Sequence, residues 1–211
     1  MVNNIVRIYH GKMAHCGVEK TIQGINDNYW FPSMRKRVID HIDNCVTCLL
    51  NNVSSNTCEG ELQETDSLSS PFQILHTDHY GPMITSANGF KHVLVVIDAC
   101  TRFTWLFPVK TTSSKETIKH MTLLFQIFGS PQQLVSDRKT SFTSLEFSNF
   151  LESNDISHRL VTVAAPLANG LVERINRFLK SSLKKIVSDQ QLWDTHLNTV
   201  QYVINNSTIC Y

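Results

Sequence analysis

Apolar residues recur with helical spacing near the N-terminus and with strand-like spacing further along the chain. Residues 19–28 and 33–44 have the three- to four-residue spacing that is typical of helices. Residues 51–70 are polar, Ser-rich and acidic and show no apolar periodicity, as a linker would. We therefore predict a small helical domain, a linker and a larger domain, over residues 1–52, 53–70 and 71–211.

The larger part begins with strands and then alternates between helices and strands. Residues 89–98 and 104–109 form two apolar runs that predict a hairpin, with the first strand buried on both faces. Two capping-box patterns open helices on either side of a short strand at residues 134–136: Ser113 with Glu116, and Thr143 with Glu146. A further strand and a long helix follow. This order predicts an α/β fold with a mixed sheet and flanking helices.

Composition narrows the class of protein. Hydrophobic residues make up 42% of the 211 positions and charged residues 18%, which indicates a globular chain rather than a disordered or fibrous one. No apolar run reaches the ~20 residues of a membrane span, and the N-terminus lacks the pattern of a signal peptide. We expect an intracellular protein, in which six cysteines favour metal binding over disulfides. The net charge of +1 combines two mildly basic ends with an acidic linker.

Four residues of the N-terminal part have the types and spacing of a zinc site. His10 and His15 are separated by four residues, and Cys45 and Cys48 by two. Zinc takes four such ligands in a tetrahedron, and one ion would cross-link a unit that is marginal at ~50 residues. The alternative is a pair of exposed histidines and a pair of small buried cysteines. Cys16, next to His15, is a competing ligand.

Three carboxylates have settings that suit a site for two divalent cations. Asp78 lies in a predicted strand, Asp137 follows the strand at residues 134–136, and Glu173 opens the last long helix. Phosphoryl transfer uses two such cations, which prefer oxygen ligands. Asp137 is equally explained as a turn residue, and Glu173 as a favourable charge at a helix N-terminus. Asp98, at the end of the most apolar strand, is a rival to Asp78.

The last long helix is amphipathic. At 100° per residue, Glu173, Arg177, Lys180 and Lys184 fall on one side, and the apolar residues cluster opposite: Val172, Ile175, Leu179, Leu183 and Ile186. The cationic side would follow a phosphate backbone. An ordinary solvated helix face explains the same pattern.

Two sets of segments resemble one protein family. AHCGVEKT, NYWFPSMRKRV and CVTC resemble the zinc domain of integrases from retroviruses and Gypsy-type long-terminal-repeat retrotransposons. HTDHYGP, VVIDACTRF, SDRKTSFTS and ANGLVERINR resemble the catalytic core of the same integrases. Between Asp78 and Asp137 lie 58 residues, and between Asp137 and Glu173 lie 35, the second spacing being the mark of the family.

The resemblance implies a function and a set of roles. Asp78, Asp137 and Glu173 would bind two Mg²⁺ or Mn²⁺ ions on a ribonuclease-H-like fold, and Asp98 would not. The implied reactions are trimming of a DNA 3′ end and attack of its hydroxyl on a target duplex. Asn176 joins the predicted DNA contacts in the last long helix, which are Arg177, Lys180 and Lys184. We expect a homo-oligomer that works in the nucleus and binds the DNA ends of its own retrotransposon or retrovirus.

Two other functions remain as alternatives. The chain ends at Tyr211 within an expected helix, so we interpret the core as C-terminally truncated, and a domesticated or inactive relative that binds DNA or protein without turnover is one reading. A ribonuclease-H-type nuclease would share the carboxylates. The zinc pattern argues against the nuclease, and the complete set of three carboxylates argues against the inactive relative.

Overall fold

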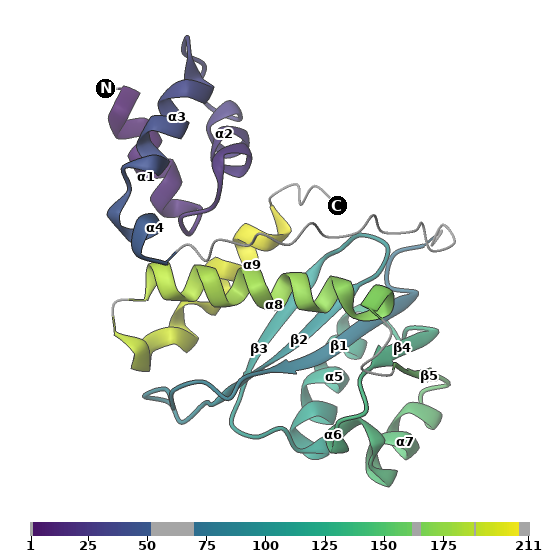
Figure 1. The fold of residues 1–211 in the computed structure, drawn as a ribbon. Helices are drawn as coiled ribbons and strands as arrows, with labels where there is room; N and C mark the ends of the chain where they lie inside the picture. The colour runs from purple at the N-terminus through teal and green to yellow at the C-terminus, as the bar shows by residue number, and fades with distance from the viewer. Residues whose placement is uncertain (1, 52–69, 162–165, 188, 207–211) are drawn as a thin grey trace. The chain divides into compact units, whose positions relative to one another are not determined.

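A computed structural model describes residues 2–51, 70–161, 166–187 and 189–206 (Figure 1). At 166–170 it describes the backbone only. The chain forms two compact units, one that combines Met1–Gly60 with Arg177–Tyr211 and one that comprises Glu61–Asn176. The predicted linker, apart from Ser70, lies outside the described residues. The domain boundaries predicted at its two ends stay a prediction.

The first unit begins with helices that are joined by short turns. Their bounds are α1 Val2–Lys12, α2 Val18–Asn26, α3 Met34–Asp43 and α4 Val46–Asn51. The helices expected at residues 19–28 and 33–44 are confirmed as α2 and α3, whereas α1 and α4 were not predicted. Apolar residues of α1 recur at positions 2, 5, 6 and 9, so this helix has an apolar side of its own.

These helices enclose a small core. Its buried members are Val6, Ile25, Phe31, Met34 and Val38. Ile25 and Val38 have no exposed surface, and they lie on the two helices that the sequence predicted. The core therefore needs α1, because α2 and α3 alone offer few apolar residues to bury.

The same unit contains the end of the long helix α8 (Pro166–Ile186), the 3-10 helix η1 (Gln190–His196) and α9 (Leu197–Asn205). The predicted long helix is confirmed, but it begins at Pro166, so Glu173 is its eighth residue and does not open it as predicted. The helix expected to run through Tyr211 ends earlier, since α9 stops at Asn205, and residues 207–211 lie outside the described residues. Among the described helices, none is both long and apolar enough to cross a membrane.

The second unit is built on a five-stranded mixed sheet with the order β3-β2-β1-β4-β5 (Figure 1). The strands are β1 Ile74–Tyr80, β2 His92–Asp98, β3 Thr104–Val109, β4 Gln133–Ser136 and β5 Ser157–Leu160. β1, β2 and β3 pair antiparallel in a meander, and β4 and β5 pair parallel with β1 and with each other. The predicted hairpin is β2 with β3, and six successive residues of β2 are buried, which confirms burial on both faces.

Helices α5 (Ser114–Phe128), α6 (Thr140–Thr143) and α7 (Leu145–Glu152) pack on the sheet. The core between them joins strand residues to helix residues, among them Leu75, Leu94, Leu134, Met121, Phe142 and Phe147. β1 is the central strand of the sheet, between β2 and β4, and this shared core holds it against the helices. The predicted α/β class, with a mixed sheet and flanking helices, is confirmed.

One of the two predicted helix caps is displaced by a residue. The Ser113 side chain accepts a hydrogen bond from the Glu116 amide and caps α5 as expected. The cap of α7 is Ser144, which accepts from the Phe147 amide at 3.2 Å, and not Thr143. Thr143 is unavailable because it forms the last residue of α6. The sequence pattern favoured Thr143 because Glu146 follows it by three residues, whereas Phe147 follows Ser144 at the same spacing.

Candidate metal centres

Four ligand atoms converge in the N-terminal helices. His10, His15, Cys45 and Cys48 each offer one atom, and these atoms all lie within 4.8 Å of one another. His10 lies near the end of α1 and His15 follows it, while Cys45 precedes α4 and Cys48 lies within it. Ala14 and His15 adopt left-handed backbone conformations, with φ of 51° and 53°. Such conformations are costly for residues other than glycine, and here they turn the chain so that His15 faces His10.

Four of the distances between these atoms are close to those of a tetrahedral site. His15 Nδ1 lies 3.1 Å from His10 Nε2 and 3.4 Å from Cys45 Sγ. Cys48 Sγ lies 3.3 Å from His10 Nε2 and 3.8 Å from His15 Nδ1. A tetrahedral zinc ion with bonds of ~2.0–2.3 Å has ligand-to-ligand edges of ~3.3–3.8 Å. The structure thus brings together the four residues that the sequence singled out, and their role as the ligands of a closed structural zinc site stays a prediction.

The protonation of these groups also suits a metal. Burial, together with the nearby His15, lowers the pKa of His10 to about 4, and burial lowers the pKa of His15 as well. Both rings are thus neutral near pH 7, which is the form that binds metal. Burial raises the pKa of the Cys48 thiol to about 11, so the thiol is protonated at neutral pH, and a bound zinc ion would favour the thiolate.

Cys16, the competing ligand, is excluded from this group. Its side chain is buried, and its Sγ lies 3.6 Å from Thr21 Oγ1 instead. His41 was missed by the sequence reasoning. Its ring meets that of His10 edge-on at 5.4 Å between centroids, so it helps to pack a ligand without supplying one. A lone histidine within a helix carried no signal of that role.

Asp78 and Asp137 are neighbours because of the strand register. β1 and β4 run parallel, with Thr77 opposite Ser136, and each aspartate is the next residue of its chain. Parallel neighbours lie ~4.8 Å apart, so the two carboxylates emerge beside each other where β4 ends. Asp78 is the fifth residue of β1 and Asp137 directly follows β4, as the sequence predicted.

The two carboxylates share a cation that the sequence reasoning did not single out. Lys139 Nζ donates to Asp78 Oδ1, and it lies 3.1 Å from Asp137 Oδ2. It also donates to the carbonyl oxygen of His79 at 3.1 Å. Burial opposes the charge of Lys139, but its bonds to Asp78 and Asp137 outweigh that effect and raise its pKa. The lysine is therefore charged and bridges the carboxylates.

Asp78 is held from several sides. Its Oδ1 also accepts from the His79 amide at 2.7 Å, and its Oδ2 accepts from Asn176 Nδ2 at 3.1 Å. Burial raises the pKa of Asp78, against the opposing effect of Lys139. A carboxylate that is buried and bound in this way has a fixed orientation, which a metal ligand needs.

Glu173 is not brought into the same group. It lies exposed on α8, and in the described part of the chain the His/Cys set is the one group of three or more ligands that is close enough to hold a metal. Asn176, three residues further along α8, contacts Asp78. Residues three apart share a helix face, so Glu173 lies one turn away from that contact. Its role as the third metal ligand stays a prediction.

Asp98 has a structural role. Its Oδ1 accepts from the amides of Phe72 and Cys100, and its Oδ2 accepts from the amide and hydroxyl of Thr101. The side chain is buried, with both oxygens occupied in the turn between β2 and β3. These contacts distinguish the role of Asp98 from that of Asp78, which their positions in the sequence could not do.

The amphipathic pattern predicted for α8 is confirmed. Val172, Ile175, Leu179 and Leu183 are buried and Ile186 is partly buried, whereas Glu173, Arg177, Lys180 and Lys184 are exposed. Asn176 is half-buried and is engaged with Asp78. The DNA contacts assigned to Asn176 and to the three cations stay a prediction.

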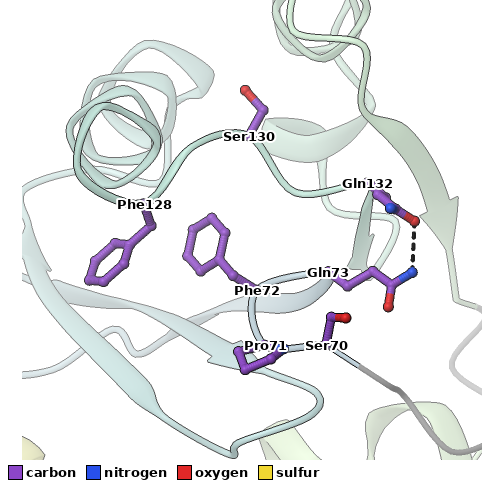
Figure 2. Close-up of a pocket in the computed structure, with 7 residues that line it drawn as sticks. All are labelled: Ser70, Pro71, Phe72, Gln73, Phe128, Ser130 and Gln132. Carbon is purple, nitrogen blue, oxygen red and sulfur yellow. Dashed lines mark hydrogen bonds between the residues drawn. The ribbon is translucent and has the colours of Figure 1, made fainter.

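A shallow pocket of about 230 Å³ lies before the start of β1 (Figure 2). Phe72 and Phe128 stack within it at 5.2 Å, and Gln73 Nε2 donates to Gln132 Oε1 at 2.8 Å. Its lining contains no ionisable side chain. Gln73 is five residues before Asp78, or roughly 16 Å along a strand, so the pocket is separate from the carboxylates.

Two family models match the chain. The integrase zinc binding domain matches residues 1–54, and the integrase core domain matches residues 69–166. These ranges contain the four His/Cys ligands and the two paired aspartates, while Glu173 lies beyond the second range.

Curated relatives are polyproteins of viruses and transposons. The Pro-Pol polyprotein of feline foamy virus is 34% identical over 198 residues, which cover 93% of this chain and 17% of that protein. The Transposon Tf2-3 polyprotein of Schizosaccharomyces pombe is 24% identical over 212 residues, which cover 98% of this chain and 16% of that protein. The chain thus spans about a sixth of the length of these relatives.

A solved structure shares the fold. A chain of the simian T-cell lymphotropic virus intasome, in complex with the PP2A regulatory subunit B56 gamma, is similar with a TM-score of 0.63 and 19% identity. The similarity covers 98% of this chain and 69% of that chain. It therefore extends over both the helical N-terminal region and the sheet.

Proposed function

The chain belongs to the integrase family, with an integrase zinc binding domain followed by an integrase core domain of ribonuclease-H-like fold, and we propose that it is a metal-dependent polynucleotidyl transferase that integrates DNA. The observation that carries this proposal is the placement of Asp78 and Asp137 side by side by the parallel register of β1 and β4.

The two metal centres have different tasks. His10, His15, Cys45 and Cys48 would hold a structural Zn²⁺ ion, which cross-links α1 to α4 in a small unit. Asp78 and Asp137, with Glu173 joining them from α8, would hold two catalytic ions, Mg²⁺ or Mn²⁺. These carboxylates are the hard oxygen ligands that such ions prefer. The bound ions would supply activation of the attacking oxygen and stabilisation of the leaving one.

The residues of the chain position the carboxylates. Asn176 orients Oδ2 of Asp78, and the His79 amide orients Oδ1. The proposed reactions are hydrolytic trimming of a DNA 3′ end and attack of the new hydroxyl on a phosphodiester of a target duplex. In trimming, water attacks the phosphodiester and the 3′ oxygen of the DNA end leaves as a hydroxyl; in joining, that hydroxyl attacks and a 3′ oxygen of the target leaves. Both are transfers of a phosphoryl group, so correct positioning of the phosphate accounts for much of the catalysis.

The DNA would meet the cationic side of α8. Lys180 and Lys184 are exposed, and Lys/Arg contacts to phosphates provide affinity that falls steeply with salt. Replacing both lysines with Gln should weaken duplex binding and reduce the slope of log affinity against log salt by roughly 2. Fluorescence anisotropy of a labelled duplex at several salt concentrations measures this slope, with Lys119→Gln on α5 as the matched control. An unchanged slope would exclude this side of α8.

The substrates would be the ends of the element and a target duplex, joined by a homo-oligomer in the nucleus. The test is a blunt duplex that carries the ends of its element, incubated with the protein and Mg²⁺ or Mn²⁺. Trimmed and joined products are expected for the wild type and for Asp155→Asn, an exposed aspartate after α7. They should be absent for Asp78→Asn and Asp137→Asn.

Other outcomes of that assay favour the other functions. DNA that is bound but neither trimmed nor joined by the folded wild type would indicate a non-catalytic relative. Cleavage of an RNA–DNA hybrid without any joining would indicate a nuclease. The paired aspartates argue against a non-catalytic relative. The four-ligand zinc site argues against a ribonuclease-H-type nuclease.

A further inference from the structure

We propose that Lys139 is an internal counter-ion of the catalytic carboxylates, which a divalent cation must displace and which therefore weakens metal binding at this site. The inference rests on the proposed function, because it concerns the metal site of the integrase core. It assigns a role to Lys139, which is not one of the expected metal ligands.

The contacts of the Lys139 ammonium group are complete. An ammonium has three N–H donors, and Lys139 Nζ meets three acceptors: Asp78 Oδ1, Asp137 Oδ2 and the carbonyl oxygen of His79. The first two are oxygens of the proposed metal ligands. An ammonium and a metal ion cannot both occupy the space between the same two carboxylates, so the two cations compete.

Local structure holds Lys139 in reach. Asp137 Oδ1 accepts from the Lys139 backbone amide at 3.1 Å, which folds the chain back after β4. Lys139 directly precedes α6, and its carbonyl oxygen accepts from the amides of Phe142 and Thr143 in that helix. These backbone bonds do not depend on the side chain. A substitution of Lys139 should therefore leave the turn in place.

Charge gives the direction of the effect. Asp78 and Asp137 are each 19% exposed, whereas the Lys139 side chain is 44% exposed. The carboxylates are thus partly shielded from water, and the lysine compensates the repulsion between them. Without it, the pair would attract a divalent cation more strongly. With it, the cation must first break a charge-assisted hydrogen bond to Asp78 and an ion pair with Asp137.

Arg138 provides a matched control. It is the adjacent residue, it carries the same charge and it is exposed. Arg138→Met removes one positive charge from the same turn. A general electrostatic effect would appear in both variants, while direct competition would appear only when Lys139 is replaced.

The experiment is Mn²⁺ titration of the zinc-loaded full chain by isothermal titration calorimetry. Lys139→Met should bind Mn²⁺ about tenfold more tightly than the wild type, since a neighbouring cation has been removed. Lys139→Arg and Arg138→Met should stay near the wild-type affinity. Lys139→Gln is the second neutral variant, for use if the Met variant does not fold, and it should tighten binding in the same way.

The outcomes separate this inference from the proposed function. Suppose that the wild type binds Mn²⁺ and that Asp78→Asn does not. If the neutral Lys139 variants then bind Mn²⁺ no more tightly than the wild type, the competition alone is overturned. Equal tightening in Arg138→Met would also overturn it, in favour of a general charge effect. Absence of Asp78-dependent Mn²⁺ binding in every protein would overturn the metal site and the competition together.

Discussion

Asn176 donates a hydrogen bond of 3.1 Å from Nδ2 to Oδ2 of Asp78, a residue 98 positions earlier in the chain. The contact joins the first strand of the core to its last long helix. It leaves Oδ2 of Asp78 oriented by α8, while Oδ1 is engaged by Lys139 and the His79 amide. Glu173 lies about one helical turn before Asn176 on the same helix.

Removal of this amide should impair the reaction more than the fold. Asn176→Ala deletes one hydrogen bond to a carboxylate, a contribution of ~1.5–3 kcal/mol, so we expect strand transfer to fall by about tenfold or more. The measurement is the rate of joined product at saturating Mg²⁺, together with the thermal midpoint. Asn198→Ala, at an exposed position of α9, is the matched control. A wild-type rate in Asn176→Ala would show that the contact does not position Asp78.

Zinc should depend on Cys45 and not on Cys16. Cys45→Ser removes one of four ligands, and we expect the N-terminal helices to lose both zinc and helicity, because the ion cross-links them. Cys16→Ser should retain zinc, since its side chain lies near Thr21 outside the ligand group. Elemental analysis gives the zinc content, and far-ultraviolet circular dichroism gives the helicity. Loss of zinc from Cys16→Ser, or full helicity in zinc-free Cys45→Ser, would contradict this assignment.

Asp98 should contribute to stability rather than to chemistry. In Asp98→Asn one oxygen becomes an NH₂ group that cannot accept from Thr101 or from the backbone amides. We expect a loss of ~1–3 kcal/mol in the free energy of unfolding, with Mn²⁺ binding retained. Urea denaturation and Mn²⁺ titration measure the two effects. If Asp98→Asn instead had full stability and bound no Mn²⁺, Asp98 would be a metal ligand.

His158 should make stability depend on pH. Its Nε2 lies 2.9 Å from Ser136 Oγ, and burial lowers its pKa from the ordinary value of 6.5. Because the unfolded chain binds the proton more readily, stability is fully present above pH 6.5 and falls as the pH drops through that value. His158→Gln keeps a donor to Ser136 and does not ionise. Below pH 6.5 the wild type should therefore lose stability relative to His158→Gln in urea denaturation, and parallel pH profiles would refute this.

Local patterns sufficed for the zinc site and for much of the fold. The four ligands occur as two close pairs, and each pair is visible in a few residues of sequence. β2 and β3 are marked by apolar runs, and α5 and α8 by a capping pattern and by helical periodicity respectively. Helix α1 was missed because polar residues interrupt its apolar positions and no capping pattern marks its start.

The proposed catalytic site depends on strand pairing that no local sequence pattern contains. Asp78 and Asp137 are neighbours because β1 pairs with β4 in one register, and a shift of one residue would turn their side chains to the opposite face. Lys139 reaches both aspartates only because of that register. Asn176 reaches Asp78 only because α8 returns to β1. These contacts join distant parts of the chain, so spacing alone did not reveal them.

The central claim is that Asp78 and Asp137 bind catalytic divalent ions, and anomalous diffraction from crystals of the chain soaked in Mn²⁺ tests it most directly. We predict an anomalous peak roughly 2.1 Å from a carboxylate oxygen of each aspartate, with Lys139 Nζ displaced from between them. A peak found only elsewhere at saturating Mn²⁺, with Lys139 still bridging the two carboxylates, would contradict the account.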